Sequence, residues 1–162
     1  MILQRARPAL LETPMEVFQQ NLFTPNDRFY VRWHWGDMPN AIDVEAYRIR
    51  LFGAVNRPLS ISLAQLLRMP RIELAAVNQC SGNSRGLFQP RVPGAQWGHG
   101  AMGNAKWMGV PLRHLLDLAG VRAGAVAIRV GALDKPSVPG APDFEKSLAI
   151  DHARDGLSLI HI

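Results

Sequence analysis

The sequence predicts an α+β fold with a mixed β-sheet, short helices and long loops. Predicted strands and single short helices follow one another without the regular alternation of a parallel α/β sheet. A stretch rich in Gly, Pro, Asn and Ser spans residues 81–103 with little periodicity, and a loop of that length inside a compact domain is usually functional. The length of 162 residues, with 48% apolar and 19% charged residues, is enough for one packed core.

The N-terminal third is expected to supply one helical turn and two strands. Residues 1–23 predict an irregular arm with a short helical turn near residues 14–20. The aromatic and β-branched run at 28–35 predicts a strand, and alternation of apolar and polar residues predicts a half-buried strand at 47–52. Pro58 then breaks this pattern.

The middle of the chain predicts a helix followed by a strand. Ser62 is a suitable N-cap for a short helix that runs through Leu67 and ends before Pro70. Residues 72–77 predict a strand that leads directly to Asn78, Gln79 and Cys80. The long loop therefore begins at the only cysteine of the chain.

The C-terminal part is expected to add one helix and one strand. Residues 111–119 place Leu112, Leu115, Leu116 and Ala119 on one helical face, and Gly120 is a suitable stop. Residues 125–130 predict a third strand, and residues 134–142 predict turns.

The charge pattern suggests an anionic ligand and argues against nucleic acid. The net charge is +5, and 15 of the 18 basic residues are Arg, which recognises oxyanions through paired hydrogen bonds. Codon choice in a GC-rich genome would also explain this excess of Arg. The chain has no basic run and no RNP-like or zinc-finger pattern, so we expect no nucleic-acid partner. No apolar stretch approaches 18 residues, so no membrane span is expected.

Cys80 admits two interpretations on its own. A single cysteine excludes an intramolecular disulfide framework, and most lone cysteines are small buried hydrophobes. The neighbours of Cys80 favour a site instead, because Gly82 and Gly86 permit close backbone approaches and Arg85 could stabilise a thiolate or an anion beside it. A thiolate in such a loop suits a transition metal.

Four segments, in order, resemble the sulfite oxidase family. They are FYVRWH at 29–34, QCSGNSR at 79–85, GAMGNAKWMGVPL at 100–112, and GALD at 131–134. The resemblance covers roughly residues 28–155 and implies the family's molybdopterin-binding fold and its molybdenum–molybdopterin cofactor. Because Ser81 and Ser84 replace an Ala and an Arg of the animal enzymes, this chain looks more like the bacterial sulfite dehydrogenases.

The resemblance implies roles for individual residues. Cys80 would supply the thiolate ligand of molybdenum, and Arg32 and Arg85 would line a pocket for a tetrahedral oxyanion. His34 would contact the pterin or its phosphate. The backbone of Tyr30–His34 and the carboxylate of Asp134 would hold the pterin by hydrogen bonds. Alternatives remain open: Arg32 as a surface residue, His34 as a structural imidazole, and Asp134 as a turn cap.

The function implied is oxidation of sulfite to sulfate, with electrons passed to a separate cytochrome c because the chain has no C-x-x-C-H motif. Two alternatives stay open: a reductase of oxidised methionine or nitrate with the same fold, and a non-catalytic domain. By resemblance, the protein would be periplasmic, with no signal peptide in this chain, and would form a homodimer or a heterodimer with a cytochrome.

The end of the chain departs from the family pattern. The expected organisation is a partial molybdopterin-binding domain at 1–156 and a non-native tail at 157–162, because LSLIHI resembles the translation of a transposon-end sequencing adapter. A domain ending near Gly156 would lack half of the cofactor cradle. We therefore expect no turnover and poor solubility from this chain alone, since an incomplete sheet exposes a strand edge.

Overall fold

The computed structural model describes residues 1–33, 39, 41–136 and 138–161. Backbone contacts divide the chain into two compact units: unit one comprises residues 1–36 and 75–106, and unit two comprises residues 37–74 and 107–162. No helix in the described part of the chain is long and apolar enough to cross a membrane.

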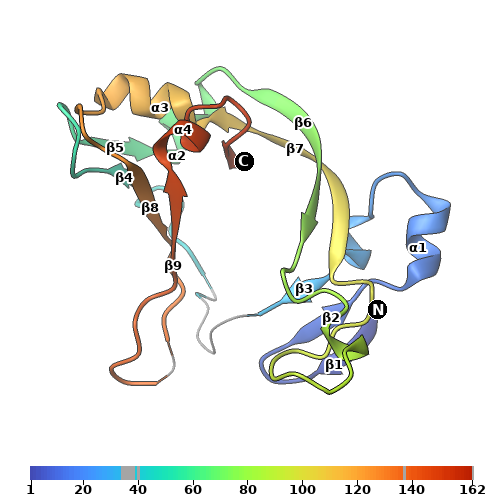
Figure 1. Cartoon of the computed structure of the whole chain (residues 1–162). Coiled ribbons are helices and arrows are strands. Elements are labelled where there is room, and N and C mark those ends of the chain that lie inside the picture. Colours follow the sequence, from blue (N-terminus) through green and yellow to red (C-terminus); the bar gives the residue numbers. More distant parts are fainter. Residues whose placement is uncertain (34–38, 40, 137, 162) are drawn as a thin grey trace. The chain divides into compact units, whose positions relative to one another are not determined.

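Unit one contains a three-stranded antiparallel sheet in the order β1-β2-β3 (Figure 1). Its complete elements are β1 (Ile2–Arg5), β2 (Leu10–Glu12), α1 (Met15–Gln20), η1 (Asn26–Arg28), β3 (Val31–Arg32) and η2 (Arg85–Leu87). The predicted helical turn near 14–20 is confirmed.

One prediction for this unit is wrong, and one is confirmed in part. The first part of the arm is a β-hairpin, because Leu10 and Glu12 are buried and pair through the backbone with the exposed β1. The strand expected at 28–35 is present at Val31–Arg32, whereas the 3-10 turn η1 occupies its start and residues 34 and 35 lie outside the described residues.

Unit two combines two β-hairpins with short helices (Figure 1). Its complete elements are β4 (Arg48–Leu51), β5 (Leu59–Ser62), α2 (Leu63–Leu67), α3 (Leu112–Ala119), β8 (Ala127–Gly131), β9 (Glu145–Ala149), α4 (Ile150–Ala153) and β10 (Leu159–His161). Strands β4 and β8 match the predicted strands, whereas β5, β9 and β10 were not predicted.

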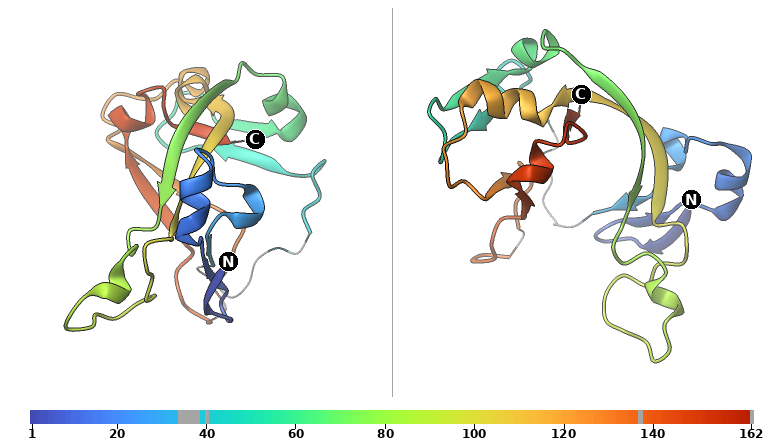
Figure 2. Two further views of the ribbon diagram at one scale, coloured as in Figure 1. Left: turned by 90° about the vertical axis from the view of Figure 1, so that its right-hand side faces the viewer. Right: turned by 45° about the horizontal axis from the view of Figure 1, so that its top comes forward.

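Two long strands are shared between the units. Strand β6 (Ile72–Gln79) and strand β7 (Met102–Pro111) are neighbours in a sheet of order β10-β7-β6, and the division between units falls within both. The loop that connects them carries η2 (Figure 2). The loop prediction for 81–103 is confirmed for most of its length, but β7 was not predicted. Mixed sheets with a few short helices confirm the α+β class.

The helices form where local sequence signals place them. The Ser62 side chain accepts a hydrogen bond from the backbone N–H of Gln65, and the Gln65 side chain accepts one from the backbone N–H of Ser62. Helix α2 therefore begins with a capping box. Helix α3 buries Leu112, Leu115, Leu116 and Ala119, as predicted. It ends at Gly120, whose φ of 67° is the left-handed conformation that favours glycine.

Strand β10 (Leu159–His161) includes half of the segment 157–162 that is expected to be non-native. It pairs antiparallel with β7, with Leu159 opposite Pro111 and His161 opposite Gly109. Strand pairing uses backbone groups that every sequence carries, so this pairing does not test the origin of residues 157–162.

Candidate functional site

Cys80 follows the last residue of β6 and begins the long loop of unit one. Its side chain is half-buried and packs against a cluster of three buried residues, Leu10, Trp97 and Ala101. Its backbone N–H donates a 2.9 Å hydrogen bond to the carbonyl of Ala101. The sulfur is therefore carried on a fixed backbone at the edge of a small core.

The turn after Cys80 is built by glycine and by one strained serine. The backbone N–H of Asn83 donates to the Cys80 carbonyl at 2.9 Å, which closes the turn. A Cβ at Gly82 would lie 2.9 Å from the Arg85 guanidinium, so a larger residue at this position would displace that side chain. Ser84 has φ of 66°, a left-handed conformation that is uncommon outside glycine. Strain of this kind often marks a functional loop.

Arg85 carries an unused set of hydrogen-bond donors. Its half-buried guanidinium lies against the backbone of Gly82 and Gly94. Among the residues that the structure describes, its side chain has no hydrogen-bond or ion-pair partner. A guanidinium holds its charge at every accessible pH, so it is ready to bind an oxyanion in a bidentate manner.

Arg32 differs from Arg85. It lies on β3 opposite Leu10, and its exposed side chain donates to the carbonyl of Trp33 at 2.5 Å. That bond satisfies part of the guanidinium locally, so Arg32 needs to reorient before it can bind an anion fully.

Tyr30 lies beside the thiol. Its ring contacts Trp97 edge to face, with centroids 6.4 Å apart, and its hydroxyl donates to the side-chain oxygen of Asn78. Burial raises the pKa of Tyr30 above 10.0, and repulsion from the negatively charged form of Cys80 raises it further. Tyr30 therefore keeps its proton at neutral pH.

Two indole groups of unit one are buried without an acceptor in the described part of the structure. They are the Nε1–H groups of Trp33 and Trp97. A buried donor without a partner costs about 1–3 kcal/mol. Trp97 belongs to the cluster against which Cys80 packs, so its N–H and the guanidinium of Arg85 are candidate donors for a ligand rich in acceptor atoms, such as a pterin phosphate or an oxyanion.

The described residues contain no group of three His, Cys, Asp or Glu side chains that could hold a metal. Cys80 could supply one thiolate to a metal whose other ligands come from an organic cofactor. The chemistry of the donor set fits a molybdenum dithiolene, which needs one protein thiolate.

The remaining predicted site residues are not all in this unit. Tyr30, Arg32, Cys80 and Arg85 lie in unit one, whereas Asp134 lies in unit two, three residues after the end of β8. Asp134 is half-buried in the turn that the sequence predicts. His34 falls outside the described residues.

One set of polar residues around this loop could not be identified from the sequence. They are Glu12, Thr13, Asn83 and His99, all of which hydrogen-bond within unit one. The available signal was Glu12, an acidic residue directly after two leucines. A strand of only three residues is too short for its alternation to show that this acidic side chain is buried.

A half-buried cysteine at the end of a strand, in the same turn as an arginine, is a candidate ligand for a metal that is bound together with an organic cofactor. Comparison with known families identifies which one. Residues 35–161 match the family described as the oxidoreductase molybdopterin binding domain, and the chain belongs to that family. The cofactor of this family is molybdopterin, which in the related sulfite oxidases carries molybdenum.

Curated relatives and one solved structure agree with this assignment. Mitochondrial sulfite oxidase of Homo sapiens is 38% identical over 152 residues, which cover 92% of this chain and 28% of that protein. The NADH nitrate reductase of Cichorium intybus is 33% identical over 89% of this chain and 17% of its own length. The sulfane dehydrogenase SoxCD from Paracoccus pantotrophus has a TM-score of 0.68 and 27% identity, covering 82% of this chain and 32% of that chain.

The share of each relative that is covered limits what transfers. The chain spans about a quarter of the length of the sulfite oxidases that it matches, 28% for the human protein and 25% for that of Gallus gallus. The fold, the family and the class of cofactor follow from the comparison. The reaction, the substrate and the electron acceptor are matters for proposal.

Proposed function

We propose that the chain is part of an enzyme that oxidises sulfite to sulfate at a molybdenum centre held by the thiolate of Cys80. The observation that carries this proposal is the half-buried Cys80 in the same turn as Arg85, whose side chain has no partner among the described residues. When bound, the molybdenum cofactor supplies the two-electron oxidation and the oxygen transfer.

The protein's own residues bind and orient the anion. Sulfite is a small dianion, and Arg85 presents parallel N–H donors to two of its oxygens. Arg32 adds a second positive charge after it releases the Trp33 carbonyl. Two guanidiniums raise the local concentration of the anion and fix its orientation.

The groups around the sulfur keep the thiolate in place. Tyr30 remains neutral and adds no charge that would repel the anion. Its bond to Asn78, two residues before Cys80, fixes the ring on the strand that carries the cysteine. In the overall reaction sulfite is oxidised, water supplies one oxygen and releases two protons, and two electrons leave to a cytochrome c-type acceptor.

The pterin would be held by hydrogen bonds to the protein. We assign the backbone of Tyr30–His34 and the carboxylate of Asp134 to this task, since Asp is a suitable acceptor for an aminopyrimidine edge. His34 would contact the pterin or its phosphate.

Nitrate reduction is the second candidate. The chicory nitrate reductase matches 89% of this chain, and nitrate is also an oxyanion that Arg85 could bind. Sulfite ranks first because the human sulfite oxidase is 38% identical over 92% of this chain, against 33% over 89% for the nitrate reductase.

The test uses the full-length protein that contains this chain, expressed in a host that makes molybdopterin, with Cys80→Ser, Arg85→Gln and the exposed Arg71→Gln as control. We expect sulfite-dependent reduction of cytochrome c to vanish in Cys80→Ser. In Arg85→Gln the KM for sulfite should rise about tenfold or more, because a charged hydrogen-bond pair is lost. Arg71→Gln should behave as the wild type.

Other outcomes would reject the assignment. A wild-type protein that reduces nitrate with a reduced dye, and leaves sulfite unchanged, would move the function to the second candidate. Equal activity in Cys80→Ser and wild type, with stoichiometric molybdenum in both, would rule out the thiolate as the metal ligand.

A further inference from the structure

The loop that carries Cys80 and Arg85 is hydrogen-bonded to a second segment, residues 97–101. Three backbone hydrogen bonds join the two segments. They run from the N–H groups of Cys80, Ser84 and Gly86 to the carbonyls of Ala101, Gly98 and Trp97, at 2.9, 2.6 and 2.8 Å. The position of residues 80–86 therefore depends on the position of residues 97–101.

Side-chain hydrogen bonds also connect these two segments. The Asn83 side-chain oxygen accepts a 2.9 Å hydrogen bond from the backbone N–H of Ala101. The Ser84 hydroxyl lies 3.0 Å from Nδ1 of His99. Ser84 has φ of 66°, so these bonds maintain a backbone conformation that a serine alone would not favour.

Glu12 holds residues 97–101 from the opposite side. Its Oε2 accepts from the backbone N–H of Gly98 at 2.9 Å, and its Oε1 accepts from that of Gly100 at 2.8 Å. Thr13 adds a bond from its own N–H to the Gly100 carbonyl at 3.0 Å. The carboxylate of Glu12 thus holds the backbone N–H groups of both glycines that flank His99.

This carboxylate is unusual because it is buried without a cation. Glu12 is only 4% exposed, and in the described part of the chain no basic side chain forms an ion pair with it. Its partners are the two glycine amides and the side-chain amide of Gln4, which donates to Oε2 at 2.8 Å. A buried charge is costly, and hydrogen bonds to a charge are about twice as strong as neutral ones, so these contacts define geometry tightly.

The glycines are required by the closeness of this contact. A Cβ at Gly98 would lie 2.6 Å from Oε1 of Glu12, closer than real Cβ contacts allow. A Cβ at Gly100 would collide with the Thr13 carbonyl. The two glycines of the sequence GHG at 98–100 therefore allow the backbone N–H groups to approach the Glu12 carboxylate, whereas larger side chains would collide with their neighbours.

We propose that Glu12 is a positioning residue for the Cys80–Arg85 site. It fixes Gly98 and Gly100, these fix residues 97–101, and residues 97–101 hold the loop in which the thiolate and the guanidinium lie. The relevance of this to catalysis rests on the proposed function. The effect on the loop itself does not, because it concerns only the exposure of Cys80.

The first test measures the alkylation rate of Cys80 by iodoacetamide in the full chain without cofactor. Glu12→Gln keeps the size of the side chain but replaces one acceptor with an amide donor that faces a backbone N–H. We expect alkylation about tenfold faster than in the wild type, because loss of one hydrogen bond to a charged group makes loop opening that much more frequent. Glu16→Gln, an exposed change of the same charge on α1, is the matched control and should leave the rate unchanged.

A second variant keeps the test decisive if Glu12→Gln does not fold. Gly98→Ala disturbs the same contact from the other side and leaves every charge in place. It should accelerate alkylation to a similar extent, and the double variant should add little to either single change, because both break one contact. Circular dichroism and urea titration confirm that each rate is measured on folded protein. Wild-type rates in both folded single variants would overturn the proposal.

The consequence for the reaction is measured separately in cofactor-loaded protein. Glu12→Gln should raise the KM for sulfite several-fold with a smaller change in kcat, since the anion pocket is loosened while the metal ligand remains. If Cys80→Ser keeps molybdenum and activity, the proposed function fails even when Glu12→Gln speeds alkylation. If Cys80→Ser is inactive but Glu12→Gln leaves both alkylation and KM unchanged, the positioning role alone fails.

Discussion

Different kinds of interaction stabilise each of the two units internally. In the described part of the chain, all three buried polar or charged residues, Glu12, Thr13 and Thr24, belong to unit one. Most buried apolar residues belong to unit two, where they form two clusters around α3. Unit one has one smaller cluster of Leu10, Trp97 and Ala101.

This difference separates stability from geometry. Apolar packing contributes free energy in proportion to the area removed from water but tolerates small shifts. Hydrogen bonds between buried polar groups fix distances and directions, and they are costly when incomplete. The unit that carries Cys80 and Arg85 is the one built with such bonds, as a binding site for a small anion requires.

The largest effect on stability is expected from the core of unit two. Leu115 is fully buried in α3, so Leu115→Ala should lower the free energy of unfolding by about 3 kcal/mol through lost burial and the cavity left behind. Leu118→Ala, on the exposed side of the same helix, should cost less than about 1 kcal/mol. Urea unfolding followed by circular dichroism measures both. Equal losses at the two positions would mean that the apolar cluster does not stabilise unit two.

A smaller effect, with its own pH dependence, is expected at Tyr30 in unit one. Tyr30→Phe removes the hydrogen bond to Asn78 and should cost about 1 kcal/mol at neutral pH. Because the pKa of Tyr30 in the folded protein lies above its ordinary value of 10.0, the wild type is stabilised below that pH and loses this contribution as pH rises through the folded pKa.

The difference between wild type and Tyr30→Phe should therefore shrink above pH 10, as measured by urea unfolding across that range. Tyr47→Phe in unit two leaves the Tyr30 hydroxyl in place and should retain the alkaline loss. A constant difference at all pH values would contradict the assigned cause.

The same contrast explains which elements the sequence could predict. Helices α2 and α3 are specified by local signals, a capping box at Ser62 and an apolar face ended by Gly120, so both were predicted closely. Strand β5 directly follows Pro58, which had been taken to end the pattern, and it forms because Leu59–Ser62 can pair with β4. Strand β7 has no alternation to reveal it and depends on distant partners.

The sequence predicts candidate site residues but not their arrangement. Motifs identified Cys80 and Arg85, yet only the structure shows that Arg85 lies against Gly82 and Gly94 without a partner among the described residues. The contact between Glu12 and two glycine amides leaves no trace in a sequence, because backbone N–H groups are the same in nearly every residue.

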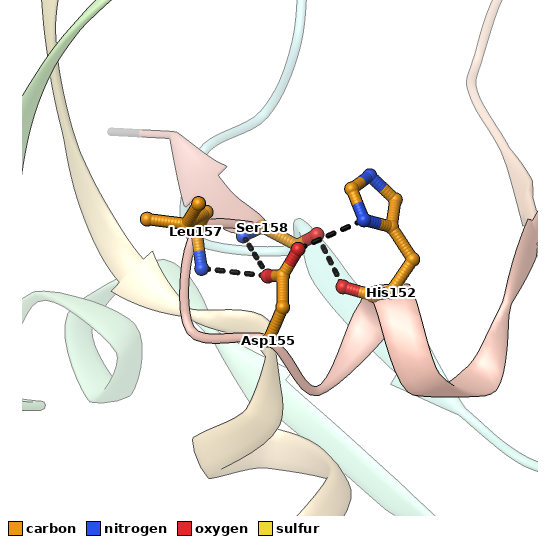
Figure 3. A network of polar contacts seen from close by, with 4 residues as sticks. All are labelled: His152, Asp155, Leu157 and Ser158. Atoms are coloured by element: carbon orange, nitrogen blue, oxygen red, sulfur yellow. Dashed lines mark hydrogen bonds and ion pairs between the residues drawn. The ribbon is translucent and has the colours of Figure 1, made fainter.

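The smallest effect is expected at a polar network of unit two, which stands on the surface instead of in a core. Figure 3 shows the Asp155 carboxylate accepting from the backbone N–H groups of Leu157 and Ser158, at 2.7 and 3.2 Å, and pairing with His152 at 2.8 Å. The bond from Leu157 is the main cause that lowers the pKa of Asp155, and Ser158 and His152 add to it.

A carboxylate with a lowered pKa stabilises the fold above its ordinary pKa, and the contribution is lost as pH falls through the folded pKa. Asp155→Asn should therefore be slightly less stable than the wild type at neutral pH and equal to it in acid, by urea unfolding at both pH values. Asp151→Asn, an exposed change in the first turn of α4, is the control for removal of a charge. If Asp155→Asn cost as much as Leu115→Ala, surface polar bonds would rival apolar packing in unit two, and the proposed division of roles between the units would fail.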